Sequence, residues 1–174
     1  QNICNYYIQQ RPLFLLVFFI LSLSLIIFWD FLTFQSLYAY LDIGSDVLNA
    51  SIPNFYHHSN FLREHGLIGW SFQAGIGQNL YPFSMGDPFN MLLYLLGYPY
   101  LVFAIIYIEV LKISLGGIFF FLYLRQLNIN QLPAIIGGVC YAFCSYNILG
   151  GAWLNWSTEA VHVALLLLAI ELFY

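Results

Sequence analysis

The chain has 174 residues, of which 61% are hydrophobic, 20% aromatic and 7% charged, and its formal net charge is -4. Soluble globular proteins carry charge on about a quarter of their residues, so this composition excludes an ordinary soluble domain and places the chain in a lipid bilayer. Four Lys and Arg residues cannot form the basic surface that nucleic acid binding needs, which excludes nucleic acid as a partner. The chain begins at Gln1 and ends at Tyr174 inside an apolar run, which indicates a piece of a longer protein.

The first apolar block follows Arg11 and Pro12 and predicts a spanning helix over about residues 13–32, since a spanning helix needs roughly 20 residues. A signal peptide is the alternative for this block. It is disfavoured because no small-residue cleavage site follows and the run ends in the bulky stretch IIFWDFLTF. A polar segment over about residues 34–86 comes next and is predicted to be a long loop.

The short apolar stretch DPFNMLLYLLGYP lies between Pro88 and Pro99 and is too short to span comfortably. We therefore expect a re-entrant or interfacial helix over about residues 88–99. Further spanning helices are predicted over about residues 101–127, 132–149 and 159–174. The predicted fold class is thus all-α, a polytopic helical membrane protein with a long first outer loop.

Two local patterns in the third spanning segment concern helix packing. Ala134 and Gly138 are four positions apart, which predicts close approach by another helix. Cys140 and Cys144 are predicted to lie one helical turn apart on the same face, where we interpret them as small packing residues rather than a metal or disulfide pair.

Arg11 and Arg125 determine the predicted orientation, because they lie at the ends of the first and second spanning segments. If successive spanning helices cross the membrane in opposite directions, both arginines fall on the same side of the membrane. The positive-inside rule makes that side cytoplasmic. The N-terminus is then cytoplasmic. The loop of residues 34–86 and the connector GGAWLNWSTEA, which contains Glu159, lie outside and are expected to meet above the helices.

The outer loop gathers several of the few ionisable groups in the chain, namely Asp42, Asp46, His57, His58, Glu64 and His65. A polar loop of this length between spanning helices is more often functional than a tether. Its histidines and acids could ligate a divalent metal. Interfacial histidines are the favoured interpretation, because adjacent histidines on a helix point about 100 degrees apart and no H-E-x-x-H spacing occurs. No cofactor and no metal site are predicted, with a divalent metal kept as the alternative.

The stretch GIGQ in the same loop lacks the pattern of a dinucleotide site and predicts a backbone turn beside an aromatic surface.

Glu109 and Lys112 lie three positions apart inside the second spanning segment. Lys112 is roughly 18 to 20 Å from either interface at 1.5 Å per residue, which is too far for its side chain to reach water. Two interpretations of a lysine at this depth stay open. Either Lys112 contacts a substrate phosphate in a lipid-carrier groove, or it forms an internal ion pair that holds helices in register.

Several motifs together resemble the N-terminal part of the YfhO family of bacterial membrane proteins. They are Gly44-x-Asp46 followed by Pro53, WSFQAGIGQN at residues 70–79, DPFN at 87–90, YLRQL at 123–127 and GGVCYAFCSYNI at 137–148. The resemblance implies the fold of the glycosyltransferase C superfamily. It also implies transfer of a sugar from a polyprenyl-phosphate carrier to a cell-envelope polymer, such as teichoic acid, on the outer face of the cell membrane. One departure is that the family usually has a Gln-Tyr pair ahead of the proline, where Ala50 and Ser51 stand here.

Transfer of a sugar from a lipid phosphate leaves a phosphate as the departing group, so the main requirement is a base for the acceptor hydroxyl. The resemblance implies that an acidic residue of the first outer loop, in its carboxylate form, serves as this base. Asp46 matches the position, with Asp42 four residues earlier, and solvated turn-forming acids are the alternative. Glu159 is a further catalytic candidate, for which helix capping is the alternative. The candidates for substrate contact are Lys112, Trp70, Asn79 and His57.

Three functions remain open from the sequence. They are a polyprenyl-phosphate-sugar-dependent glycosyltransferase, a lipid or sugar-lipid transporter whose path Lys112, Glu109 and the re-entrant segment would line, and a non-catalytic membrane assembly subunit. The expected partners are a polyprenyl-phosphate-linked sugar, a cell-envelope polymer and membrane lipid.

Overall fold

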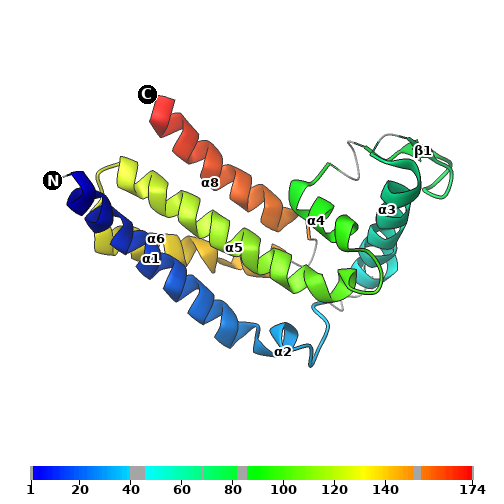
Figure 1. The fold of residues 1–174 in the computed structure, drawn as a ribbon, viewed down its shortest axis with the longest axis horizontal. Helices are drawn as coiled ribbons and strands as arrows, with labels where there is room; N and C mark the ends of the chain where they lie inside the picture. The colour runs from blue at the N-terminus through cyan, green and yellow to red at the C-terminus, as the bar shows by residue number, and fades with distance from the viewer. Residues whose placement is uncertain (1, 40–45, 68, 82–85, 151–153, 174) are drawn as a thin grey trace.

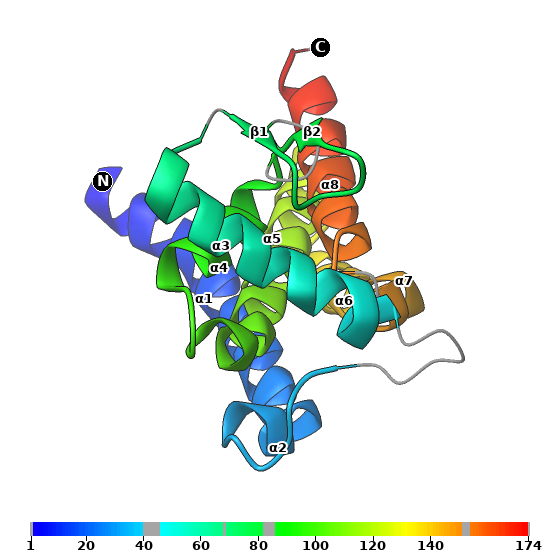
Figure 2. The same ribbon diagram turned by 90° about the vertical axis from the view of Figure 1, so that its right-hand side faces the viewer.

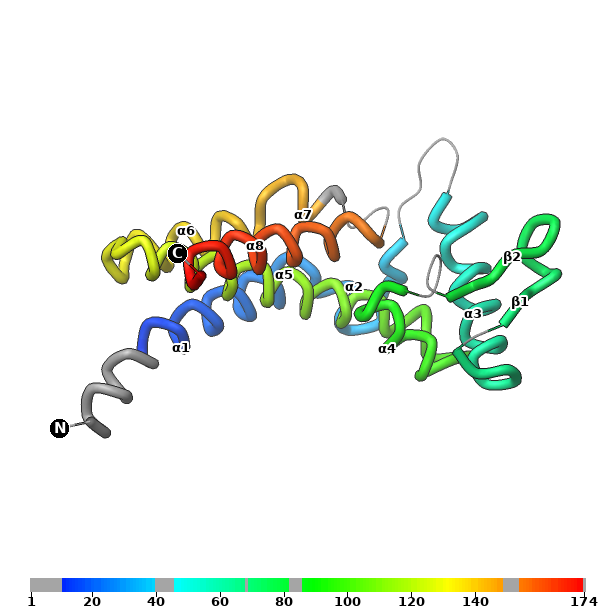
Figure 3. Tube along the Cα trace, turned by 90° about the horizontal axis from the view of Figure 1, so that it is seen from above, coloured from blue at the N-terminus to red at the C-terminus, as the bar shows by residue number. Residues whose placement is uncertain are grey.

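The computed structural model describes residues 2–39, 46–67, 69–81, 86–150 and 154–173, and within them the chain is mostly helical (Figure 1). The helices of the bundle are α1 (Asn2–Ile27), α4 (Pro88–Leu96), α5 (Leu101–Gln126), α6 (Gln131–Ala142) and α8 (Trp156–Phe173). α5 lies at the centre and contacts the other four. α1 begins, α5 ends and α6 begins at one end of the bundle, called the α6 end here (Figure 1). The other end, called the α3 end, is crossed by α3 (Ile52–His65) (Figures 1 and 3).

Among the described residues, α5 and α8 are long and apolar enough to span a membrane, while the apolar part of α1, Arg11–Ile27, is shorter. Two of the four predicted spanning helices therefore meet the length requirement. The first predicted helix breaks at Phe28 and continues as α2 (Trp29–Leu32). Beyond it the chain folds back, so that the Tyr38 ring packs edge-on against the Phe28 ring at a centroid distance of 5.9 Å.

The prediction of one continuous helix over residues 132–149 is wrong, because α6 ends at Ala142 and α7 (Ser145–Gly150) follows as a separate helix. The Asn147 side-chain amide donates to the carbonyl oxygens of Tyr141 and Ala142, at 2.8 and 3.2 Å. A side chain thus satisfies carbonyls that the next helical turn would otherwise use, which stabilises the break.

α5 and α6 pack closely where Gly117 faces Gly138. A side-chain carbon built at Gly138 would lie 3.0 Å from the Gly117 carbonyl oxygen, and Ala134 is fully buried. The predicted close approach at Ala134 and Gly138 is confirmed. The prediction that Cys140 and Cys144 share one helix face is wrong, because Cys140 lies exposed on α6 whereas Cys144 lies beyond its end; both are free cysteines, as expected of residues that do not form a disulfide.

The predicted outer loop contains regular structure that the sequence analysis missed. η1 (Val47–Ser51) continues directly into α3, and β1 (Trp70–Ser71) and β2 (Gln78–Asn79) form an antiparallel hairpin. Figure 2, which views this end, shows α3 and the hairpin over the bundle. The Phe55 ring of α3 packs on the Tyr94 ring of α4 at 5.6 Å, and Ser59 Oγ donates to the Tyr94 carbonyl oxygen at 2.7 Å. Packing on α4 therefore fixes α3, within the predicted loop, against the bundle.

α4 has nine residues and is about 14 Å long, well short of the roughly 30 Å hydrocarbon core of a bilayer. It begins at Pro88 behind the capping residue Asp87 and ends at Leu96, and the following Gly97 has a φ of 66° that suits glycine. Arg63 of α3 donates to the carbonyl oxygen of Leu96 at 2.9 Å and so caps the C-terminus of α4. This short helix fits the expected non-spanning segment, and its re-entrant or interfacial placement stays a prediction.

Candidate functional site

A polar cluster, buried except at Asp87 and Asn155, joins the first turn of α4, the middle of α5 and the start of α8. We call it the polar cluster, and its members are Asp87, Asn90, Glu109, Lys112, Leu154 through its carbonyl, Asn155, Ser157 and Thr158. The exposed fractions of Asn90, Glu109, Lys112 and Ser157 are between 1% and 2%. Polar groups are costly to bury, so each needs a partner.

Asp87 connects α4 to α8. One carboxylate oxygen accepts the backbone N–H groups of Phe89 and Asn90, at 2.8 and 3.1 Å, which caps the N-terminus of α4. The other oxygen accepts a hydrogen bond from Thr158 Oγ1 at 2.7 Å. Asn90 adds a second link, because its Nδ2 donates to Asn155 Oδ1 at 3.1 Å. The DPFN motif thus holds the start of α8 against α4.

Lys112 connects α5 to the same region. Its ammonium nitrogen donates to Glu109 Oε1 at 2.9 Å, to the Leu154 carbonyl oxygen at 2.6 Å and to Ser157 Oγ at 3.3 Å. These acceptors match the three hydrogens of the ammonium group. Of the two interpretations from sequence, the geometry favours the internal ion pair over a phosphate contact. Glu109 Oε2 and Asn90 Oδ1 have no hydrogen-bond partner among the described residues.

A pocket of about 370 Å³ lies between α3 and the hairpin. Its aromatic lining residues are Phe61, Trp70 and Phe72, and its polar lining residues are His57, Asn60, Glu64, His65, Ser71 and Gln73. The volume falls in the usual range for small-ligand sites, and convergent polar groups beside rings are typical of such sites.

The structure brings three predicted substrate-contact residues together in this region. His57 Nε2 is hydrogen-bonded to Ser71 Oγ at 2.9 Å, which fixes the imidazole at the pocket wall. Trp70 pairs with Asn79 across the hairpin, so Asn79 lies beside the pocket without lining it. Gly77 has a φ of 106°, and a side-chain carbon there would lie 2.6 Å from the Trp70 indole nitrogen. The predicted backbone turn beside an aromatic surface is confirmed.

The predicted catalytic acids do not line this pocket. Asp46 is half-buried at the start of η1, where its side chain makes no capping hydrogen bond. Glu159 is exposed in the first turn of α8 and accepts a hydrogen bond from the Tyr146 hydroxyl at 3.1 Å. Asp42 lies outside the described residues. The catalytic roles of Asp46, Asp42 and Glu159 stay predictions.

Sequence reasoning missed five side chains of the polar cluster, which are Asp87, Asn90, Asn155, Ser157 and Thr158. The Asp-Pro pair before an apolar run is a helix-start signal that could have indicated Asp87. No local pattern marks the others, because the bonded partners of Asn155 and Thr158 lie 65 and 71 residues away in the sequence.

His58 provides a pH-dependent contribution to stability. It is buried on α3 against the Tyr94 ring, and burial, followed by the neighbouring His57, lowers the pKa of His58 to about 4. The unfolded chain, with an ordinary histidine pKa near 6.5, binds more protons between these values. This contribution is therefore complete above about pH 6.5 and is lost as the pH falls toward 4.

We expect His58→Phe to flatten the dependence of melting temperature on pH in this window. His65→Phe, which changes an exposed histidine, should leave the slope unchanged, and equal slopes for wild type and His58→Phe would contradict the assignment.

Among the described residues, no group of three or more His, Cys, Asp or Glu side chains is arranged to hold a metal ion. No curated protein and no solved structure gives a match to the chain. The family model described as bacterial membrane protein YfhO matches residues 14–173, so the chain belongs to the YfhO family of bacterial membrane proteins.

Proposed function

We propose that this chain forms the N-terminal part of a membrane glycosyltransferase that moves a sugar from a polyprenyl-phosphate carrier to a cell-envelope polymer, such as teichoic acid, on the outer face. The observation that carries the proposal is the pocket between α3 and the hairpin, at the end of the bundle that the sequence predicts to be outside. It lies in the segment that follows the first apolar helix, where the family resemblance implies the catalytic acid.

The pocket lining suits a carbohydrate. A sugar ring has apolar faces that pack on aromatic rings, and its edge carries hydroxyl groups that need hydrogen-bond partners. The Trp70 and Phe72 side chains are 57% and 81% exposed, so their rings are accessible to such a ligand. Glu64 and His57 supply acceptors and donors beside them.

Asp46 supplies the base in this proposal. As the acceptor oxygen bonds to the sugar carbon, the bond from that carbon to the phosphate breaks, the phosphate leaves as an anion, and the carboxylate takes the hydroxyl proton. Asp46 directly precedes η1, which continues into α3, and His57 lies eleven positions further on, at most about 16 Å along the helix axis. A polymer held in the pocket extends this far, so one unit can occupy the pocket while another presents its hydroxyl to Asp46.

Reconstitution tests the proposal against the two alternatives. Full-length protein in liposomes receives a polyprenyl-phosphate carrier with a radiolabelled sugar, and teichoic acid is the acceptor. A glycosyltransferase moves the label into the polymer and releases polyprenyl phosphate. A transporter moves the label across the bilayer with the sugar-phosphate bond intact, and an assembly subunit does neither. Intact carrier in the presence of the acceptor would contradict the proposal, and protein-free liposomes provide the baseline.

A further inference from the structure

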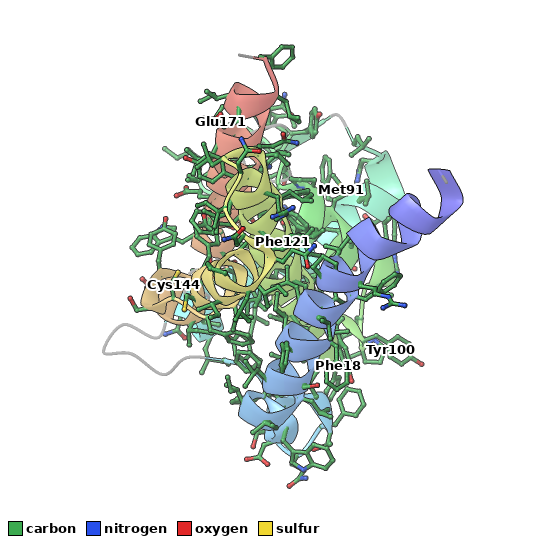
Figure 4. All side chains as sticks on the ribbon, turned by 90° about the vertical axis from the view of Figure 1, so that its left-hand side faces the viewer. Phe18, Met91, Tyr100, Phe121, Cys144 and Glu171 are labelled. Carbon is green, nitrogen blue, oxygen red and sulfur yellow. The ribbon has the colours of Figure 1, made fainter. Side chains whose placement is uncertain are left out.

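A second pocket, of about 480 Å³, lies at the α6 end of the bundle. Figure 4 views this end and labels Phe121, one of the lining residues. One part of the lining is polar and consists of Arg125, Gln126, Asn128 and Gln131. The other part is apolar and consists of Pro12, Leu13, Phe121 and Leu122. The pocket is therefore amphiphilic and lies far from the α3 end that the proposed sugar transfer uses.

The polar part of this pocket carries the positive charge of Arg125, which pairs with no carboxylate in the part of the chain that the structure describes. Arg125 donates to the Ile129 carbonyl oxygen at 2.5 Å, and it takes part in no ion pair among the described residues. A guanidinium has five N–H donors, so others remain for a ligand. Glu171, near the end of α8, is not a lining residue. Three amide side chains beside Arg125 add further donors.

The helix ends at this pocket also favour an anion. α6 begins at Gln131, and its capping position, Asn130, makes no side-chain capping hydrogen bond. The N–H groups of Gln131 and Leu132 and the positive end of the helix dipole thus remain available at the pocket, whereas Pro133 has no N–H. The negative end of α5 is offset, because the carbonyl oxygens of Tyr123, Leu124 and Arg125 accept backbone hydrogen bonds in the turn toward α6.

We propose that this pocket binds the phosphate headgroup of an anionic membrane phospholipid. Arg125, the amides and the start of α6 hold the phosphate, while Leu13 and Leu122 contact the upper part of an acyl chain. The outward face of α1 continues this apolar surface, because the Phe14 and Phe18 side chains are 68% and 64% exposed. A lipid matches both halves of the pocket, whereas a free phosphate matches only the polar half.

Native mass spectrometry of the full-length protein, released from nanodiscs of equal phosphatidylglycerol and phosphatidylcholine, measures the lipid that stays bound. We expect wild type to retain phosphatidylglycerol in preference to phosphatidylcholine. Arg125→Gln should lower this retention about tenfold, the usual effect of losing a hydrogen bond to a charged group. Arg11→Gln is the matched control, because Arg11 is exposed beside Pro12 but does not line the pocket. It should change retention by less than about twofold, since an exposed charge contributes little.

Two further variants separate the contribution of the pocket's shape from that of its charge. Leu122→Trp fills the apolar half without changing charge and should also lower retention, while Arg125→Lys keeps the charge and should preserve most of the preference. Equal losses in Arg11→Gln and Arg125→Gln would show a general surface attraction and overturn the proposal. Wild-type retention in Leu122→Trp would overturn it too, as would displacement of the lipid by millimolar inorganic phosphate, which would indicate a site for free phosphate.

Discussion

Asp46→Asn is expected to reduce sugar transfer by the full-length protein by about a hundredfold to ten-thousandfold, which is the usual cost of losing a general base. Asparagine keeps the shape of the side chain but cannot take a proton from the acceptor hydroxyl. Asp46 occupies the capping position before η1 and makes no capping hydrogen bond there, so the substitution removes no structural contact of that kind. Binding of the carrier lipid should change far less than turnover.

The measurement is the rate of transfer of radiolabelled sugar at matched amounts of protein in the membrane. Asp30→Asn is the matched control, because Asp30 is an exposed acid in α2, shortly before the same segment. It should transfer sugar at nearly the wild-type rate. Near-normal turnover in Asp46→Asn would remove Asp46 from the mechanism and move the assignment to Asp42 or to the transporter hypothesis.

Lys112→Met is expected to destabilise the protein by about 3–5 kcal/mol, because breaking a buried ion pair leaves an uncompensated charge in a low-dielectric interior. Glu109 is 2% exposed and its Oε2 has no partner among the described residues, so the carboxylate would lose its charged donor. The Leu154 carbonyl and the Ser157 hydroxyl would also lose Lys112 as a partner. The loosened contact between α5 and α8 should lower the thermal unfolding midpoint of the detergent-purified protein.

A double variant shows whether the ion pair accounts for this loss. Lys112→Met combined with Glu109→Leu replaces both charges with apolar side chains of similar size, and it should recover much of the lost stability. A double variant as unstable as the single one would show that the pair is not the source. If Lys112→Met reduced carrier binding without lowering the unfolding midpoint, the phosphate-contact interpretation would replace the structural one.

The composition and local patterns determined the class of the protein and part of its helical framework. The apolar runs predicted α5 closely and α8 within a few residues, because a helix in a bilayer must satisfy its own backbone and such runs are long and local. The sequence also indicated the Glu109–Lys112 pair, because a three-residue spacing is enough to bring two side chains together on a helix. The order of short motifs placed the chain in the YfhO family, over residues 14–173.

The tertiary structure decided the features that depend on partners far apart in the sequence. The break within residues 132–149 is stabilised by hydrogen bonds of the Asn147 side chain, which hydrophobicity does not encode. α3 is ordered by its packing on α4, and the polar cluster depends on pairs such as Asp87 with Thr158. Such contacts form only when folding brings the segments together, and burial then makes each hydrogen bond costly to lose. The sequence therefore determined that the chain is helical and lies in a membrane, whereas the packing of helices determined which of its few polar groups meet.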